Sequence, residues 1–180
     1  MEASQFYTLG NQELLHLHKT AFLCSRTYPA SVVLKAYDWA IALREQGKCV
    51  ISGFHSQIEQ DALHYLLKGT QPIIVALARG FKQRLEPELQ HGLNEHRLLL
   101  ITPFDASVTR ITARTAYKRN QLMVEVADDL LVAFVSPEGS LQHLIQEQLP
   151  KHKRIVTFEF EENTSLLQAG AMVYQFNMKR

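Results

Sequence analysis

Short runs of apolar residues alternate along the chain with segments whose apolar residues recur every three or four positions. The short runs predict buried strands, and the periodic segments predict amphipathic helices. The predicted strands are Ala21–Cys24, Cys49–Ser52, Ile73–Leu77, Leu98–Thr102, Leu130–Val135 and Ile155–Phe160. The predicted helices are Ala30–Gln46, Ser56–Lys68, Pro87–Glu95, Thr109–Ala127 and Ser140–Gln148.

Local signals predict where the first two helices end and begin. The side chains that we expect the first helix to bury lie at helical spacing and are Val33, Tyr37, Ala40 and Ile41. Gly47 follows, and glycine ends helices because it readily adopts the left-handed conformation. Ser56 and Glu59 have the spacing of a capping box, in which each side chain accepts a hydrogen bond from the backbone N–H of the other.

The alternation of strands and helices predicts the fold class. Strands that are apolar on both faces belong to parallel sheets with helices on both sides. Right-handed crossovers then give a doubly wound, Rossmann-like α/β fold with a mostly parallel sheet. We predict one domain over residues 1–180, with a core of about residues 19–160. Residues 161–180 predict an extra helix, Thr164–Ala169, and an edge strand, Ala171–Phe176.

Composition excludes several classes of protein. Of the 180 residues, 46% are hydrophobic and 21% are charged, which is enough apolar surface for a core and argues against disorder. The longest apolar runs, such as Leu98–Ile101 and Leu130–Val135, are too short to span a bilayer. The first residues lack the features of a signal peptide, so we expect a cytoplasmic protein. Cys24 and Cys49 then predict reduced, buried thiols rather than a disulfide or a metal site.

The placement of the charges matters more than their sum. The net charge is +1, which is not that of a strongly basic nucleic-acid-binding protein. Arg110, Arg114, Lys118 and Arg119 nevertheless lie within ten residues, with no acidic residue among them. This run has two interpretations, a phosphate-binding surface or a solvated helix face.

The loops that follow the predicted strands are where a ligand is expected. Ligands of doubly wound folds bind beyond the carboxyl ends of the strands, where helix N-termini point toward them. The loops here include Cys24–Thr27, Ser52–Ser56, Ala78–Phe81 and Ser136–Ser140. Their Ser and Gly residues let a phosphate approach the backbone, and Arg offers a planar fork to its oxygens, so they predict a phosphate or nucleotide ligand.

Other motifs and residues limit this interpretation. The sequence lacks the GxSxG elbow of hydrolases, the GxxxxGK motif of P-loop NTPases and the GxGxxG of ordinary NAD binding. Ser25 and Ser56 either contact the ligand or cap helices. His55 either belongs to the site or is a surface histidine of its loop.

Several of these motifs, taken in order, resemble the DprA/Smf family of Rossmann-type DNA-processing proteins within the SLOG group. The stretch LGNQELLHLHKTAFLCSRTYP is similar to the family's entry segment, in which a Gly-Ser-Arg turn follows the first strand. VISGFHSQIEQDALHYLLKGTQPIIVALARGF is similar to its Ser-Gly loop and next strand, and TAYKRNQLMVEVADDLLVAFVSPEGS to its Arg-Arg-Asn helix and last Gly-Ser. The likeness spans about residues 9–149 and is that of a divergent branch, often encoded without flanking domains.

The resemblance implies a protein that binds single-stranded DNA, with a RecA-type recombinase and a homodimer as further expected partners. Arg26, Ser52, Gly53, Lys118, Arg119 and Asn120 fall on family positions for phosphate binding. With the strand-end residues added, the predicted binding set is Ser25, Arg26, Ser52, Gly53, His55, Ser56, Lys118, Arg119, Asn120, Gly139 and Ser140. No metal, cofactor or catalytic residue is predicted for a binding protein of this kind.

The chain also departs from the family pattern. Cys24 replaces the glycine of the Gly-Ser-Arg turn, and His55-Ser56-Gln57 stands where the family has Ala-Arg-Gly. Two alternatives therefore stay open. One is a nucleoside-monophosphate phosphoribohydrolase of the LOG kind, for which Glu59 is the only acid we would nominate as catalytic. The other is a sensor that binds a small nucleotide in the same pocket.

Overall fold

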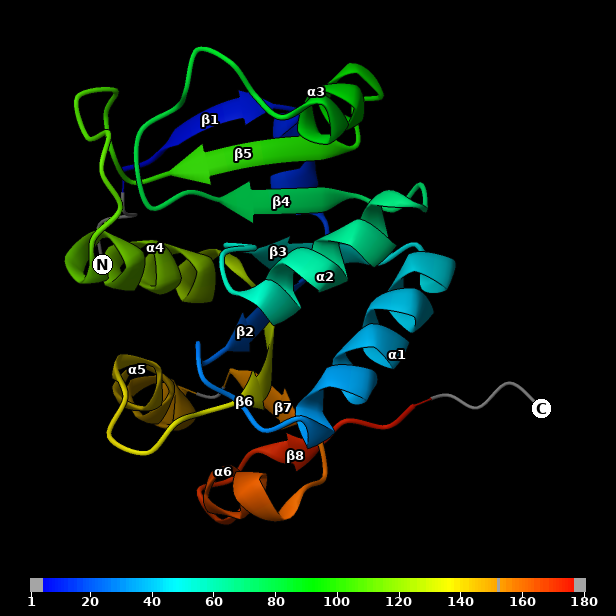
Figure 1. Ribbon diagram of the computed structural model, residues 1–180, viewed down its shortest axis with the longest axis vertical. Coiled ribbons are helices and arrows are strands. Elements are labelled where there is room, and N and C mark those ends of the chain that lie inside the picture. Colours follow the sequence, from blue (N-terminus) through cyan, green and yellow to red (C-terminus); the bar gives the residue numbers. More distant parts are fainter. Residues whose placement is uncertain (1–4, 152, 177–180) are drawn as a thin grey trace.

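The computed structural model describes residues 5–151 and 153–176 and contains a single mixed sheet covered by helices (Figure 1). In spatial order the strands are β1 (Tyr7–Gly10), β5 (Leu98–Thr102), β4 (Ile73–Ala76), β3 (Cys49–Ser52), β2 (Lys19–Cys24), β6 (Asp129–Phe134), β7 (Arg154–Thr157) and β8 (Met172–Val173). The helices are α1 (Ser31–Gln46), α2 (Gln57–Leu67), α3 (Pro87–Asn94), α4 (Ala113–Val126), α5 (Ser140–Gln148) and α6 (Thr164–Gln168). The short 3₁₀ helices are η1 (Gln12–His16), η2 (Leu149–Lys151) and η3 (Glu161–Asn163). The predicted α/β fold with a mostly parallel sheet is confirmed.

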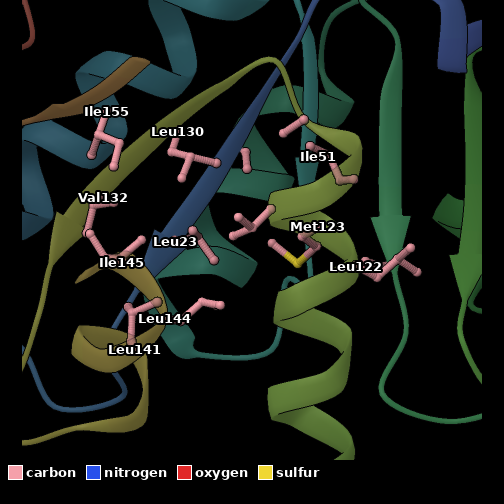
Figure 2. Close-up of a cluster of buried hydrophobic side chains, with 14 of the residues drawn as sticks. Leu23, Ile51, Leu122, Met123, Leu130, Val132, Leu141, Leu144, Ile145 and Ile155 are labelled. Atoms are coloured by element: carbon pink, nitrogen blue, oxygen red, sulfur yellow. The ribbon is translucent and has the colours of Figure 1, made fainter. Parts of the chain in front are cut away.

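Two apolar layers lie on opposite faces of the sheet. Because successive strand side chains point to opposite faces, Ala21 and Leu23 of β2 join the layer under α4 and α5, whereas Phe22 and Cys24 join the layer under α1 and α2. Figure 2 shows the first layer, with strand residues such as Leu130 and Val132 pointing toward α4 and α5. The sheet is therefore buried on both faces, as its near-continuous apolar strands require.

The edge strand β1 was not predicted from the sequence. It pairs antiparallel with β5, with Tyr7 opposite Thr102, and its outward side chains are largely exposed. An edge strand of this kind has no continuous apolar run to reveal it. Gly10 ends it at φ +114°, and a Cβ there would lie 2.4 Å from the carbonyl oxygen of Leu98. Only glycine fits this close approach.

The predicted buried stripe of α1 was wrong in phase. The fully or nearly fully buried residues are Val32, Ala36, Trp39, Ala40 and Leu43, while Val33, Tyr37 and Ile41 are only partly buried. Trp39 decides the phase, because its large ring stacks on Phe22 of β2 with 4.7 Å between ring centroids. Tyr37 instead donates a hydrogen bond from its hydroxyl to Asp61 Oδ2 of α2 at 2.6 Å.

The C-terminal region is shorter in its regular structure than predicted. The helix is present as α6, but the edge strand is limited to Met172–Val173 rather than Ala171–Phe176. Beyond it, the rings of Tyr174 and Phe176 pack on Phe158, with centroids 6.2 and 6.0 Å apart. Aromatic packing therefore takes over from strand pairing at this edge. Residues 177–180 of the predicted segment lie outside the described residues.

None of the helices in the described segments combines the length and the apolarity needed to cross a membrane.

Both cysteines are free and buried, as predicted, and should react slowly with thiol reagents. Burial raises the pKa of Cys49 to about 12, and burial likewise raises the pKa of Cys24, so little of either thiol is the reactive thiolate at neutral pH. We expect a maleimide to label the native protein only slowly and the guanidinium-unfolded protein at once. Rapid labelling of both thiols in the native protein, followed by mass spectrometry, would refute this.

Candidate anion site at the carboxyl ends of the strands

The strand order reverses between β2 and β6, and a cavity lies beyond this point. From β2 the chain proceeds outward through β3, β4 and β5, whereas β6, β7 and β8 extend to the other side. The loops after β2 and β6 therefore diverge, which opens a crevice at the carboxyl ends of the strands. The cavity there has a volume of about 330 Å³. Its polar lining residues are Cys24, Ser25, Arg26, Thr27, His55, Ser56, Glu59, Tyr117, Arg119, Asn120, Ser136 and Ser140, with Gly139 beside them.

Hydrogen bonds join the two diverging loops. The backbone N–H of Ser136 donates to Ser25 Oγ at 2.8 Å, and the hydroxyl of Ser136 donates to the carbonyl of Thr27 at 3.1 Å. Of the two interpretations of Ser25, helix capping is therefore not the one observed, since Ala30 precedes α1 as its cap residue. The hydroxyl of Ser25 instead joins the loops after β2 and β6, which both line the cavity.

The loop after β3 uses its polar side chains to fix its own conformation. Ser52 is fully buried and donates its hydroxyl to the carbonyl of Phe22 at 2.9 Å, so it lines no part of the cavity. Ser56 caps α2, and Glu59 Oε2 accepts from the backbone N–H groups of His55 and Ser56 at 3.0 and 2.9 Å. The predicted capping box is present. One carboxylate oxygen of Glu59 thus accepts two backbone hydrogen bonds from the loop. Phe54 of the same loop has a left-handed backbone conformation, with φ +46°.

Helix α4 turns the two basic residues of the Lys-Arg-Asn segment to different sides. The helix begins at Ala113 rather than at Thr109, because Thr112 and Thr115 form a capping box. Arg119 then shares the inward stripe with Leu122 and Met123, at positions i, i+3 and i+4. Lys118 points outward, as do Arg110 and Arg114 nearby, and Lys118 does not line the cavity. The basic run is thus a solvated face with one buried member.

Arg119 carries a positive charge that is almost completely buried. Only 6% of its surface is exposed, and its Nε donates to Asn120 Oδ1 at 2.7 Å. Its guanidinium lies against the backbone of Gly53, where a Cβ would come within 1.8 Å of Nη1. Within residues 5–151 and 153–176, no carboxylate forms an ion pair with it. Burial is the main cause that lowers the pKa of Arg119, with Arg26 adding to the effect and Glu59 opposing it.

His55 stands at the mouth of the cavity. Its side chain is exposed, and its pKa is lowered first by partial desolvation and then by the charges of Arg119 and Arg26, against the opposing effect of Glu59. The imidazole is therefore mostly neutral at neutral pH in the free protein. A bound anion would offset the two arginines and favour its protonated form.

The structure brings together most, but not all, of the predicted site. The residues that line this cavity as predicted are Ser25, Arg26, His55, Ser56, Arg119, Asn120, Gly139 and Ser140. Gly53 lies beneath the guanidinium of Arg119, while Ser52 is covered and Lys118 faces away. The prediction omitted Thr27, Tyr117 and Ser136. Tyr117 has a sequence signal, because it precedes Asn120 by three residues on the same helix face.

The chemistry of this lining suits an anion rather than a metal ion. Among the described residues, no three His, Cys, Asp or Glu side chains are grouped as metal ligands. The cavity instead offers guanidinium and hydroxyl donors, and α5 begins at it. Gly139, the cap residue of α5, supplies no side chain to accept from the first N–H groups of that helix. Such groups bind phosphate oxygens readily.

The family model described as DNA recombination-mediator protein A matches residues 2–174 of the chain. The chain belongs to this family. It is the family that the motifs resembled, so the resemblance is confirmed over nearly the whole sequence. No curated protein is similar enough to the chain to match it.

Solved structures of DprA proteins share the fold of this family member. DNA processing protein A from Streptococcus pneumoniae has a TM-score of 0.77 at 17% identity, and the match covers 94% of this chain but 62% of that one. The chain thus spans less than two thirds of the pneumococcal protein. The Helicobacter pylori DprA, described by its single-stranded DNA binding mode, has a TM-score of 0.74 at 16% identity, with coverage of 96% and 82%.

The likeness of fold extends beyond DprA proteins. The molybdenum cofactor binding protein of Rippkaea orientalis has a TM-score of 0.58 at 11% identity, with coverage of 88% of this chain and 90% of that one. Such low identities show a common fold and carry no ligand with them.

Proposed function

We propose that this member of the family binds single-stranded DNA in DNA processing and seats one backbone phosphate on Arg119. The observation that carries the proposal is the buried guanidinium of Arg119, with which no carboxylate of the described residues forms an ion pair. An unpaired buried charge is costly, and a phosphate that reaches it would supply the missing negative charge and two oxygen acceptors for the N–H groups of the planar guanidinium. Membership of the family and the binding described for the Helicobacter pylori DprA support the choice of single-stranded DNA.

The surface outside the cavity favours a polymer over a single nucleotide. Arg26 is an exposed residue of the cavity lining, and Arg114 and Lys118 are exposed outside the cavity on the outer side of α4. A strand anchored at Arg119 would have further phosphates within the field of these charges. Each neutralised phosphate releases condensed counter-ions, so the affinity would depend on salt.

A fluorescence anisotropy titration tests the proposal. A labelled oligothymidylate is titrated with the protein at low and moderate salt, and free mononucleotides are added as competitors. We expect salt-sensitive binding that mononucleotides displace only weakly. Displacement by a mononucleotide at low concentration would overturn the polymer assignment and indicate a nucleotide sensor, and absence of binding at every salt concentration would overturn the proposal.

The outward basic residues should contribute to affinity mainly through salt dependence. We expect Arg114→Ala and Lys118→Ala each to weaken binding modestly and to reduce the salt slope by about 0.7 per lost phosphate contact. Lys48→Ala is the matched control, because Lys48 is exposed before β3 at the amino end of the sheet. Equal slopes for all three variants and the wild type would contradict a role for this face.

Binding should also take up a proton at His55. The pKa of His55 is lowered in the free protein by desolvation and by Arg119 and Arg26, and a bound phosphate raises it. Affinity therefore increases as the pH falls from the pKa of the complex to that of the free protein, and levels off below it. An oligonucleotide without terminal phosphates avoids a second titrating group.

The matched pair for this pH experiment is His55→Asn and His16→Asn. His16 is exposed in η1 and should leave the pH profile of binding unchanged. His55→Asn should flatten the profile. A pH dependence that survives His55→Asn would show that another group takes up the proton.

The recombinase partner, the homodimer and the non-catalytic role stay predictions. They rest on the family resemblance alone.

A further inference from the structure

A smaller cavity lies at the amino ends of the strands, on the face of the sheet that α1 covers. We call it the amino-end cavity, and its volume is about 150 Å³. Thr20 lines it near the start of β2, whereas Cys24 at the end of β2 lines the anion site. The two residues are separated by about 13 Å of strand. None of the described residues lines both cavities, so the amino-end cavity is a separate feature of the molecule.

Trp39 lines the amino-end cavity and carries an unsatisfied hydrogen-bond donor. Its indole is fully buried and stacks on Phe22. Its Nε1 has no hydrogen-bond partner among the described residues. The great majority of buried polar groups in native proteins have a partner, which is protein, water or a ligand, so this N–H requires an acceptor from outside the chain.

The charged residues of the lining leave an excess of positive charge. Oδ2 of Asp129 accepts from His18 Nε2 at 3.0 Å and from Arg154 Nη1 at 3.2 Å. This contact uses one of the five N–H groups that a guanidinium offers. Lys48 is exposed and lines the same cavity. Two permanent cations therefore accompany one carboxylate that is already paired, which favours an anionic ligand.

The remaining walls and the size of the cavity restrict what that anion can be. Leu43 and Val156 line the cavity and are each only 3% exposed, so part of the wall is apolar. An engineered cavity of about 150 Å³ in another protein holds one benzene molecule, so this volume accommodates about six non-hydrogen atoms. A nucleotide is too large for it, whereas a carboxylate with a short alkyl chain has the right size.

We infer that the amino-end cavity binds a small organic anion, namely a carboxylate with a short apolar chain of the size of butyrate. Its oxygens accept from the free N–H groups of Arg154 and from the indole of Trp39, and its chain packs on Leu43 and Val156. Water alone would satisfy the indole but would leave the apolar wall wet and the positive charge without a partner. The inference is independent of DNA binding at the other end of the sheet.

The single tryptophan of the chain makes a direct test possible. In isotope-labelled protein, Trp39 gives one indole N–H signal in the NMR spectrum, and this signal is followed while sodium butyrate is added at constant ionic strength. We expect a saturable shift at roughly millimolar butyrate. Butyramide, which has the same chain without the charge, should leave the signal in place.

Three results of this titration would overturn the inference. Absence of any shift with butyrate would leave water as the occupant of the cavity. An equal shift with butyramide would show that the cavity fills with apolar molecules and does not recognise the charge. A saturable shift with inorganic phosphate but not with butyrate would assign the cavity to an inorganic anion.

Substitution of Arg154 tests the role of the cation. Its side chain is 60% exposed, so Arg154→Gln should fold, and it should weaken butyrate binding at least about tenfold. Arg154→Lys should recover part of the affinity. Arg84→Gln is the matched control, because Arg84 is exposed before α3 and does not line the cavity. Equal affinities of Arg154→Gln and Arg84→Gln for butyrate would contradict the proposal.

Backbone signals in the same spectra locate the ligand. The amide signals of Thr20 and Val156 should shift together with the indole of Trp39, because all three residues line the amino-end cavity. The signals of Gly53 and Asn120 should not move, because these residues lie at the anion site. Shifts confined to Gly53 and Asn120 would place butyrate beside Arg119, which would overturn this inference and leave the proposed function untouched.

Discussion

Replacement of Arg119 by methionine should abolish most of the affinity for single-stranded DNA and leave the fold as stable as before, or more so. The side chain is nine-tenths or more buried, donates to Asn120 and has no ion pair among the described residues. Loss of one member of a buried charge pair in a complex costs about 2–5 kcal/mol of binding. In the free protein, methionine removes an uncompensated charge and fills a similar volume, which is neutral or stabilising.

The opposite signs of the two effects make the prediction specific. Anisotropy titration measures the loss of affinity, and urea denaturation measures the free energy of unfolding. Arg119→Lys keeps the charge but not the planar fork, so its affinity should lie between those of the wild type and Arg119→Met. Arg110→Met is the surface control, since Arg110 is exposed. A large loss of stability with unchanged affinity in Arg119→Met would mean that Arg119 is structural.

Replacement of Gly53 by alanine should weaken DNA binding at least about tenfold by displacing the same guanidinium. An added Cβ would lie 1.8 Å from Nη1 and 2.3 Å from Cζ of Arg119, so the side chain must move. The clash is with the far end of a flexible side chain, and the backbone of Gly53 is outside the left-handed region. Folding should therefore lose little free energy, while the phosphate loses its aligned donors.

A double-mutant cycle shows whether the effect passes through Arg119. In an Arg119→Met background, we expect Gly53→Ala to change the affinity much less than it does in the wild type, because the group that it displaces is already absent. Additive losses in the double variant would show instead that Gly53 acts on the ligand directly, for example through close approach of its backbone.

The regular elements of this protein could be predicted because their signals are local. Cys49–Ser52 and Leu98–Thr102 are strands with the limits that their apolar runs indicate, and the capping box of Ser56 and Glu59 starts α2. The edge strand β1 had no such signal, since its residues face solvent and are held by pairing with β5. Pairing with a distant strand leaves no apolar pattern in β1 itself, whereas its partner β5 has one because both of its faces are buried.

The site could be predicted only to the level of its loops. The rule that ligands bind at the carboxyl ends of strands indicates the loops that carry Ser25, Arg26 and Ser136–Ser140, and these loops line the cavity. It does not distinguish Ser25, whose hydroxyl joins two loops, from Ser52, whose hydroxyl is buried against Phe22. The hydrogen-bond partner of each hydroxyl lies on another strand or loop. Whether the hydroxyl is open to a ligand therefore depends on how the strands are assembled in the sheet.

By itself, the sequence determined the fold class, the order of the central strands and helices and the family, because periodicity, caps and ordered motifs are properties of the chain. The tertiary structure alone decided that Arg119 is buried while Lys118 is exposed, although the two are adjacent. Successive helix residues differ by roughly 100° in direction, so the packing of Leu122 and Met123 on the sheet sets which one faces inward. The same packing places the guanidinium in the wall of the anion site, whose other walls come from elements that are distant in sequence.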